Sequence, residues 1–498
     1  MPAARLPRAS RGHSSLATSA ILLLLSLLLP GCSPKPSTIA ILHATVIDAT
    51  GAPPRPDTTV LIRGQEIIAI GPSASFQVPR EAATLDASGK FLIPGLVDSH
   101  AHLTAAGEPA GSRDFVIPLL IANGITTVRD MGGKVELLRA LRTEIARDSI
   151  FHTRFHGPQI FFTGPYLDGD PPSFQPSIVV KTAAQATAAV DLLTSEGVDF
   201  IKTQSRLDRE AYFAIAEESK KKGIRFVGHV PDSVSAFEAA AAGQSSIEHL
   251  TGILLACSSQ ENELRAAQTA PPNQTPLQSQ AQDLAWQRKL LATQSPEKTD
   301  ALISAFVAQQ TWQVPTFPIL ARLAFMTPAA NPANDPRMKY VPANEKKLWQ
   351  AGISGQLDGQ TESDFALREE IIRRSLAIVA KMQQAGVRIM AGTDTPAPNV
   401  FPGSSLHEDL AYLVQAGLTP MQALQAATRN PSEFLHQLDT RGTIAPNKIA
   451  DLVLLDANPL TDIHNTQKIR AVILRGWLFD RITLDAMLYK VEWSAQTH

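Results

Sequence analysis

Two histidines separated by one residue are well placed to bind a metal ion. His100 and His102 come at the end of an apolar run, residues 91–97. If that run is a strand, both side chains point to the same side, because side chains alternate along a strand. Two imidazoles at a strand end hold either one metal ion or ordinary hydrogen bonds. The choice depends on whether the rest of the chain supplies further ligands.

Further ligand types follow short apolar segments that are far apart along the chain. Each has an ordinary explanation when taken alone, as a solvated lysine, a structural histidine or a helix N-cap. Together with the histidine pair they indicate one site, because the carboxyl ends of parallel barrel strands converge on one face. They are Lys202, His229, His249 and Asp394.

The elements that must position these residues alternate between strands and helices. This alternation predicts a parallel α/β architecture, and eight strands are the number that closes a (β/α)8 TIM barrel. Helices are expected over 183–196 and 406–416. The predicted strands are 95–98, 126–129, 159–162, 199–202, 225–228, 246–248, 312–315 and 388–391.

Both ends of the chain have a β pattern that the middle lacks. Residues 38–93 and 441–487 predict a small composite β-sandwich domain, with the barrel over 94–440. Two stretches rich in polar residues and proline interrupt the barrel pattern, at about 258–296 and 327–364. Long insertions of this kind either cover a site or lack order, and the sequence leaves both open.

The N-terminus has the pattern of an export signal. Basic residues precede the apolar run 20–29, which is too short to span a membrane, so residues 1–32 are expected to be a signal peptide. The end at Leu29-Pro-Gly-Cys32 resembles a bacterial lipobox. Cys32 is then lipidated, and the protein is an exported lipoprotein held at the cell envelope by its lipid alone. The alternative is a plain signal peptide with an incidental cysteine.

Composition narrows the partners and the metal chemistry. The chain has 45 Lys+Arg and 47 Asp+Glu and no run of basic residues, which argues against nucleic acid as a partner. Besides Cys32 the sequence holds one cysteine, Cys257. A cysteine-ligated zinc site is therefore excluded, and nitrogen and oxygen must hold any metal. The sequence leaves the oligomeric state open.

Four segments resemble the metal-dependent amidohydrolase superfamily: residues 94–102, 124–130, 391–394 and 442–455. The segment from Leu406 to Pro431 is similar to the imidazolonepropionase-like and prolidase-like (dipeptidase) branch. The resemblance runs from about Thr38 to Ile482.

The resemblance implies a ligand set. It assigns His100, His102 and Asp394 to one zinc ion and His229 and His249 to a second. Lys202 matches the lysine that becomes N-carboxylated and bridges both metals. A free ammonium would repel Zn²⁺, whereas a carbamate donates oxygen, so burial is expected to lower the pKa of this lysine.

The implied function is a binuclear zinc amidohydrolase that cleaves the amide bond of a dipeptide, prolidase-like, or of an N-acyl amino acid. Two metals would activate water, Asp394 would act as general base, and His229 or the second metal would stabilise the oxyanion. One alternative is hydrolysis of a cyclic amide or ring C–N bond, as in imidazolonepropionases, which use one metal and lack that lysine. Another is a non-catalytic binding lipoprotein.

Substrate residues are less well defined. Arg129 ends the second predicted strand and either binds a substrate carboxylate or holds a loop. Tyr166 follows the third strand, within a segment (164–170) that departs from the Gly-Gly-His common in the branch. Four other histidines are expected to be structural or surface residues: His43, His407, His436 and His464.

Overall fold

A computed structural model describes residues 38–104, 112–151, 156–268, 276–325, 334–357 and 359–497. The expected signal peptide and Cys32 lie outside these residues. Within them, every helix is too short or too polar to cross a membrane.

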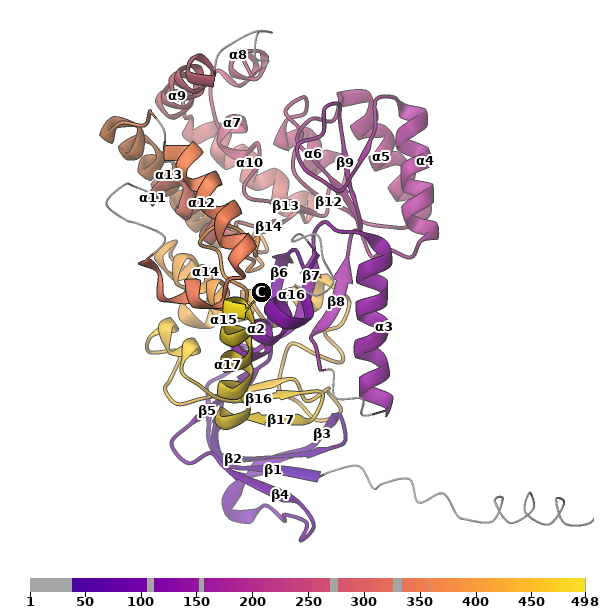
Figure 1. Cartoon of the computed structure of the whole chain (residues 1–498), viewed down its shortest axis with the longest axis vertical. Coiled ribbons are helices and arrows are strands. Elements are labelled where there is room, and N and C mark those ends of the chain that lie inside the picture. The colour runs from indigo at the N-terminus through magenta and orange to yellow at the C-terminus, as the bar shows by residue number, and fades with distance from the viewer. Residues whose placement is uncertain are drawn as a thin grey trace, which may run out of the picture. The chain divides into compact units, whose positions relative to one another are not determined.

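Strands from both ends of the chain form one sheet, as the indigo and yellow arrows of Figure 1 show. The strand order is β17-β16-β15-β5-β1-β2-β3, and β4 pairs with β1. This confirms the β-rich part of the predicted fold. The bounds are β1 (Thr38–Val46), β2 (Arg55–Arg63), β3 (Glu66–Pro72), η2 (Ser73–Ser75), β4 (Ala83–Asp86), β5 (Phe91–Pro94), β15 (Leu452–Leu455), β16 (Ile469–Leu474) and β17 (Trp477–Asp480).

Strand β15 lies between two apolar cores. Leu452 and Leu454 belong to the core of the sheet, together with Ile41 and Val60 from the N-terminal strands. Val453 and Leu455 point to the opposite side, into the larger core that the barrel shares. The unbroken apolar run of this strand is therefore explained, because a strand that is buried on both faces needs no polar alternation.

The barrel strands close a ring around the site. The strands form two parallel ladders, β6-β7-β8 and β9-β11-β12-β13-β14. Backbone hydrogen bonds close the gaps between the ladders: Asp199 N donates to Phe162 O (2.9 Å), and Ser99 N donates to Ala391 O (3.0 Å). The eighth position is the segment 388–391, which bridges to β14 through Ile389. The predicted (β/α)8 barrel is confirmed. Its strands are β6 (Leu96–Ala101), β7 (Ile125–Asp130), β8 (Gln159–Phe162), β11 (Ile201–Thr203), β12 (Phe226–Gly228), β13 (Ser246–Glu248) and β14 (Trp312–Val314); β9 (Tyr166–Asp168) and β10 (Ser177–Val179) are additional short strands.

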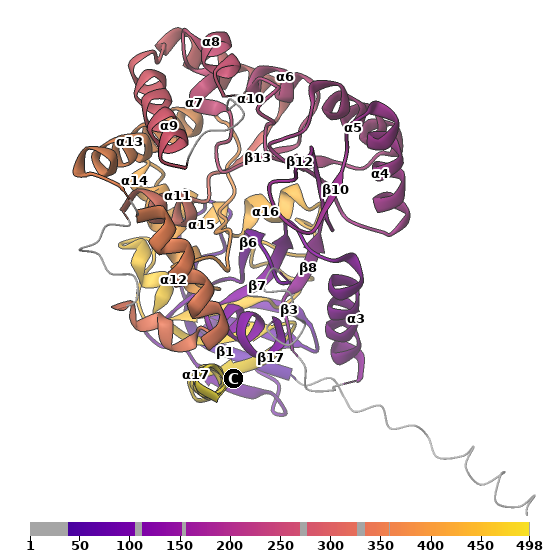
Figure 2. The ribbon, with the colours of Figure 1, turned by 45° about the horizontal axis from the view of Figure 1, so that its top comes forward.

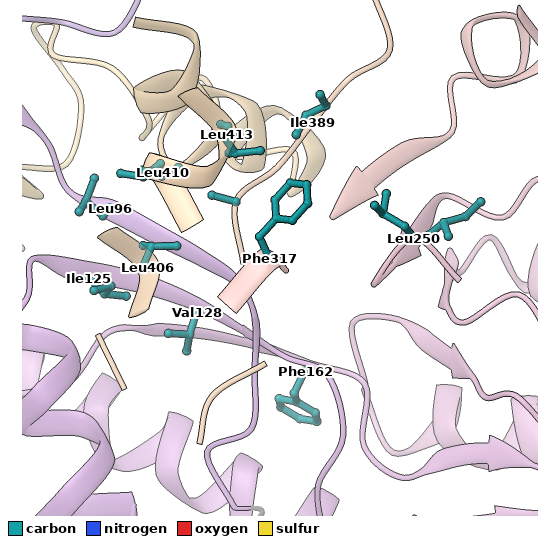
Figure 3. Close-up of a cluster of buried hydrophobic side chains, with 14 of the residues drawn as sticks. Leu96, Ile125, Val128, Phe162, Leu250, Phe317, Ile389, Leu406, Leu410 and Leu413 are labelled. Atoms are coloured by element: carbon teal, nitrogen blue, oxygen red, sulfur yellow. The ribbon is translucent and has the colours of Figure 1, made fainter. Parts of the chain in front are cut away.

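Helices pack their apolar faces against the barrel. In α14, Leu406, Leu410 and Leu413 recur at helical spacing and face Leu96 and neighbouring strand residues in the cluster of Figure 3. The barrel helices are η3 (Ser112–Val116), α2 (Ile117–Ala122), α3 (Val135–Phe151), α4 (Ala183–Ser195), α5 (Arg209–Lys222), α6 (Ala236–Ala241), α7 (Ile253–Ala256), α10 (Pro296–Gln309), α11 (Phe317–Phe325), α13 (Glu362–Gln384), α14 (Ser404–Gln415), α15 (Pro420–Ala426) and α16 (Arg429–Phe434), followed by η6 (Ile463–Gln467) and α17 (Arg481–Thr497).

Both insertions are helical where the structure describes them. The first contains α8 (Glu261–Ala266) and α9 (Pro276–Ala292), and the second contains η5 (Pro336–Tyr340) and α12 (Ala343–Leu357). Helix α13 packs against α9 and α11, and Figure 2 shows these helices on the same side of the molecule. The insertions therefore add a helical layer next to the barrel.

Candidate metal centre

The histidine pair meets Asp394 at the carboxyl end of the barrel. Asp394 Oδ1 lies 3.2 Å from His100 Nε2 and 2.9 Å from His102 Nε2. One ligand atom from each residue lies within 4.8 Å of the other two. Asp394 adopts a left-handed backbone (φ +67°), and its N–H donates to His100 O at 2.7 Å. This turn at the end of the eighth strand aims the carboxylate at the two rings.

The other three expected ligands surround the same point. Lys202 Nζ lies 3.2 Å from His100 Nε2, and the His249 ring centroid is 4.4 Å from that of His100 and 5.0 Å from that of His229. All six side chains predicted from the sequence are thus brought together, although they come from five strands. This is the convergence expected of a parallel barrel.

Hydroxyl groups fix the rings of His229 and His249. Nδ1 of His229 is hydrogen-bonded to Ser205 Oγ (2.9 Å), and Nδ1 of His249 to Thr316 Oγ1 (2.6 Å). Among the described residues, Nε2 of neither ring has a hydrogen-bond partner. Each histidine therefore keeps one nitrogen for a metal ion while its other nitrogen sets the ring orientation.

The other pair of rings is oriented in the same way. Nδ1 of His102 donates to Gly132 O (3.1 Å), and Nδ1 of His100 donates to Glu248 Oε2 (2.8 Å). Both contacts place the lone pair on Nε2, next to Asp394. A carboxylate behind a metal-binding imidazole also raises its basicity, so Glu248 supports the site although it is not itself placed as a ligand.

Glycine is required at the end of β12, where this strand pairs with β11. Gly228 has φ +120°, and a Cβ there would lie 2.4 Å from Thr203 O and 3.3 Å from Lys202 Cδ. Any larger residue would push against the backbone that carries the lysine. Gly228 therefore sets the strand spacing at which Lys202 and His229 share one site.

Buried carboxylates connect the strands beneath the ligands. Asp98 Oδ1 accepts from the N–H groups of His100 and Thr393, and burial raises the pKa of Asp98 to about 7. Asp409, from the segment that resembles the prolidase-like branch, accepts from Phe317 N (2.9 Å) and Gly392 N (3.1 Å). Helix α14 thereby holds the ends of two strands.

The electrostatics favour metal binding. Burial, and then the positive charge of Lys202, lower the pKa of His100, and the same two causes take the pKa of His229 well below its usual value. Burial likewise takes the pKa of His249 well below its usual value. These rings are therefore neutral, the form that donates to a metal. The surrounding histidines hold the pKa of Asp394 well below its usual range. Burial lowers the pKa of His102, but the contact with Asp394 outweighs burial and raises it, so this ring must give up its Nε2 proton when a metal ion binds. Neutral imidazoles and an ionised carboxylate are a donor set that suits a divalent ion such as zinc.

Lys202 is buried among these donors. Its side chain is 1% exposed, and burial lowers its pKa to about 8. Its Nζ also lies 5.4 Å from the centre of the Tyr166 ring. An amine in this position reaches its neutral form more easily than a lysine at the surface.

A cavity of about 610 Å³ opens onto the site. Tyr166 lines it, with Oη 3.4 Å from His102 Nδ1, as predicted from its place after the third strand. Gly132 makes room for this ring, since a Cβ there would lie 2.2 Å from it. Trp349 of the second insertion also lines the cavity. The insertion thus contributes to the wall of the site.

Arg129 does not lie in this wall. Its side chain is 1% exposed, and it donates to Ser99 O (2.6 Å), Ser246 Oγ (3.1 Å) and Glu248 Oε1 (2.8 Å). A substrate carboxylate has no route to a guanidinium whose donors are used inside the barrel. The structure therefore corrects the expected substrate contact and assigns Arg129 to positioning Glu248.

Sequence reasoning missed Glu248 as a functional residue. A signal was present, because Ser246 and Glu248 alternate with Ile247 along β13 and so share one side of the strand. The four other histidines singled out from the sequence match their expected roles. His407 is buried between Thr466 (3.0 Å) and Asn123 (3.2 Å), whereas His43, His436 and His464 are exposed.

The sequence pattern of the amidohydrolase family matches residues 91–267 and 319–478, and the chain belongs to this family of hydrolases. An imidazolonepropionase of Herpetosiphon aurantiacus is 23% identical over 438 residues, or 86% of this chain and 91% of that protein. An adenine deaminase of Rubrobacter xylanophilus is 31% identical over 71 residues, or 14% of this chain, and this match spans only 12% of the deaminase.

Solved structures share the fold. A Xaa-Pro dipeptidase with bound methionine in its active site is 20% identical, with a TM-score of 0.62, and the match covers 89% of this chain and all of that one. Bottromycin amidohydrolase is 22% identical, with a TM-score of 0.67 and coverage of 93% and 91%. These similarities establish the barrel with its β-rich part.

Proposed function

We propose that this protein hydrolyses the amide bond of a small acyclic substrate, a dipeptide or an N-acyl amino acid, with two zinc ions bridged by N-carboxylated Lys202. The observation that carries the proposal is the position of the Lys202 amine, buried and 3.2 Å from His100 Nε2 among five other potential ligands. An ammonium there would repel a metal ion. A carbamate formed on the neutral amine would instead supply two oxygens between the two ligand groups.

Asp394, His229 and the bound metal ions each have a separate role in the proposed hydrolysis. The metal ions, when bound, supply a water of lowered pKa and polarise the substrate carbonyl. Asp394 is ionised and faces the cavity, so it can take a proton from the attacking water and pass it to the leaving amine. His229 contributes to oxyanion stabilisation by holding the second metal position, where the bound ion would offset the negative charge.

The size of the cavity and the family relatives support this substrate class. About 610 Å³ accommodates a molecule of dipeptide size. The similar Xaa-Pro dipeptidase holds methionine in its active site, a free amino acid of the kind that hydrolysis of a dipeptide releases. The similarity to an imidazolonepropionase favours a second candidate, hydrolysis of a cyclic amide. Lys202 argues for the acyclic reaction, because a one-metal site has no use for a bridging lysine.

Metal analysis combined with a hydrolysis panel tests the proposal. Purified protein is expected to hold two zinc ions per chain and to hydrolyse dipeptides or N-acyl amino acids faster than cyclic amides. Lys202→Ala should lose one metal and most activity, and added acetate should restore part of both by replacing the carbamate oxygens. Lys298→Ala is the matched control, because Lys298 pairs with Glu261 away from the site. One metal per chain with cyclic-amide activity would overturn the proposal in favour of its alternative.

We also propose that the protein is exported and anchored through lipidated Cys32. Support comes from the basic and apolar residues that precede Leu29-Pro-Gly-Cys32. Cys32→Ser should move the protein from the membrane fraction to the soluble fraction and abolish labelling by radioactive palmitate. Unchanged fractionation and labelling would exclude this anchor.

A further inference from the structure

One cation in the catalytic cavity has no anionic partner. Arg322 lies on α11, directly after the seventh barrel strand, and lines the same cavity as Asp394 and Trp349. Its Nη1 donates to Pro398 O (2.7 Å) on the loop that follows Asp394. Among the described residues, no carboxylate lies within ion-pair distance of this guanidinium.

The same guanidinium presents an unused donor. Arg322 Nε is buried and has no hydrogen-bond partner among the described residues. A buried donor without a partner is costly, and native structures keep few of them. With Nη1 fixed on Pro398, Nε and Nη2 remain as an adjacent pair of N–H donors. Such a pair matches the two oxygens of a carboxylate, a geometry that lysine does not offer.

The charges that line the cavity also favour binding of a carboxylate at Arg322. Asp394 is the one carboxylate among its described lining residues, and Lys202 becomes an anion once it is N-carboxylated, so Arg322 is the cation that remains among them. Burial lowers the pKa of Arg322 to about 10, and nearby Asp394 opposes this shift, so the guanidinium stays charged at neutral pH. Asp394 is one of the proposed metal ligands and lies against His100 and His102, outside ion-pair distance of Arg322. The cation is therefore left for an anion that enters from outside.

We propose that Arg322 binds the free α-carboxylate of the substrate and so makes the enzyme selective for N-acyl amino acids and dipeptides over their C-terminal amides. This inference rests on the proposed amide hydrolysis. It gives Arg322 the carboxylate-binding task that the sequence placed on Arg129. In this arrangement the substrate carboxylate lies at Arg322, next to the Pro398 loop, and the scissile amide of the substrate lies toward the six candidate metal ligands.

A pair of substrates that differ only at the carboxylate tests the proposal. The best-hydrolysed dipeptide and its C-terminal amide are compared in the wild type, Arg322→Met, Arg322→Lys and the surface control Arg374→Met, whose side chain is 52% exposed on α13. Arg322→Met should lower kcat/KM for the free acid about 10- to 100-fold, mainly through KM, and change that for the amide less than about threefold. Arg322→Lys should be intermediate. Equal losses for acid and amide would overturn the proposal, because they would mean that Arg322 only holds the Pro398 loop.

A binding measurement separates this inference from the proposed reaction. Calorimetric titration of the zinc-loaded wild type compares L-methionine with L-methioninamide, neither of which contains the N-acyl bond that the enzyme is proposed to cleave. The acid should bind at least about tenfold more tightly, and Arg322→Met should remove that difference. If the enzyme cleaves no amide but this difference is present, the proposed function fails and the carboxylate site stands. Equal binding of the acid and the amide to the protein that retains Arg322 would overturn the carboxylate site itself.

Discussion

Arg129 and Glu248 form an ion pair inside the barrel, with Nη2 2.8 Å from Oε1 and both side chains at most 1% exposed. The second oxygen of Glu248 accepts from His100. Arg129, and then the hydrogen bond with His100, outweigh burial and lower the pKa of Glu248 to about 2. Arg129 therefore keeps Glu248 ionised, with a fixed negative charge behind the ring of the candidate metal ligand His100.

Breaking this pair should cost more than removing both partners. Arg129→Met leaves a buried carboxylate without its counter-ion, and the free energy of unfolding should fall by about 3–5 kcal/mol. The double variant Arg129→Met/Glu248→Gln should lose less, because no buried charge is left unpaired. Urea unfolding of the metal-free proteins measures both values. A double variant less stable than the single would contradict this account.

His407 should make stability depend on pH below neutrality. Burial lowers its pKa to about 4, so between pH 4 and about 6.5 the unfolded chain binds a proton that the folded chain does not. Stability from this residue is complete above about pH 6.5 and is lost as the pH falls toward 4, by roughly 3 kcal/mol in all. His407→Gln should flatten the curve over this range.

Unfolding of the wild type and His407→Gln at several pH values between 4 and 8 checks this prediction. Only the difference between the two curves is attributed to His407, since buried Asp409 has a raised pKa and contributes with the opposite sign. Parallel curves would rule out the assignment.

Gly132→Ala should displace Tyr166. The added Cβ would lie 2.2–2.4 Å from atoms of the phenol ring, and overpacking of this kind costs about 1–3 kcal/mol. We expect lower stability and a raised KM, both partly restored by Tyr166→Ala in the same chain. Gly352→Ala on α12 is the control, because a Cβ there meets nothing within 4 Å. Thermal unfolding and steady-state kinetics provide the readouts, and equal behaviour of the two alanine variants would refute the steric argument.

Removal of metal should destabilise the fold, because the proposed ions would link six side chains from five strands. An ion present at a hundred times its dissociation constant stabilises the folded state by about 2.7 kcal/mol. Dialysis against a chelator should lower the melting temperature of the wild type, and added zinc should restore it. Asp394→Asn should reduce this response, whereas Lys298→Ala should keep it. A melting temperature indifferent to chelator would argue against a bound ion.

The convergence of the six candidate ligands was predictable because it depends on topology. His100, Lys202 and Asp394 each follow a recognisable apolar segment, and a parallel barrel brings all such ends to one face. Arg129 shows the limit of this reasoning. Its strand-end position was correct, yet its role depends on Ser246 and Glu248, which no local pattern connects to it.

Arg322 was not predictable at all. Its importance arises from a contact with Pro398 and from the lack, among the described residues, of a carboxylate within ion-pair distance, and both are properties of the folded cavity. Strand β9 was missed for a related reason. Its three residues are too few for a period-two pattern, and they are strand only because β10 and β11 pair with them.

The sheet shared by both chain ends dictates an order of assembly. Strand β5 pairs with β15, with Phe91 opposite Leu455. The edge of β5 that pairs with β15 therefore stays without this partner strand until the ribosome has made nearly the whole chain. Until then Leu92 of β5 has been synthesised but Leu452 of β15 has not. The growing chain therefore has an unpaired strand edge, which can pair with another molecule. A premature stop shortly before residue 452 would therefore damage the first part of the protein to be made.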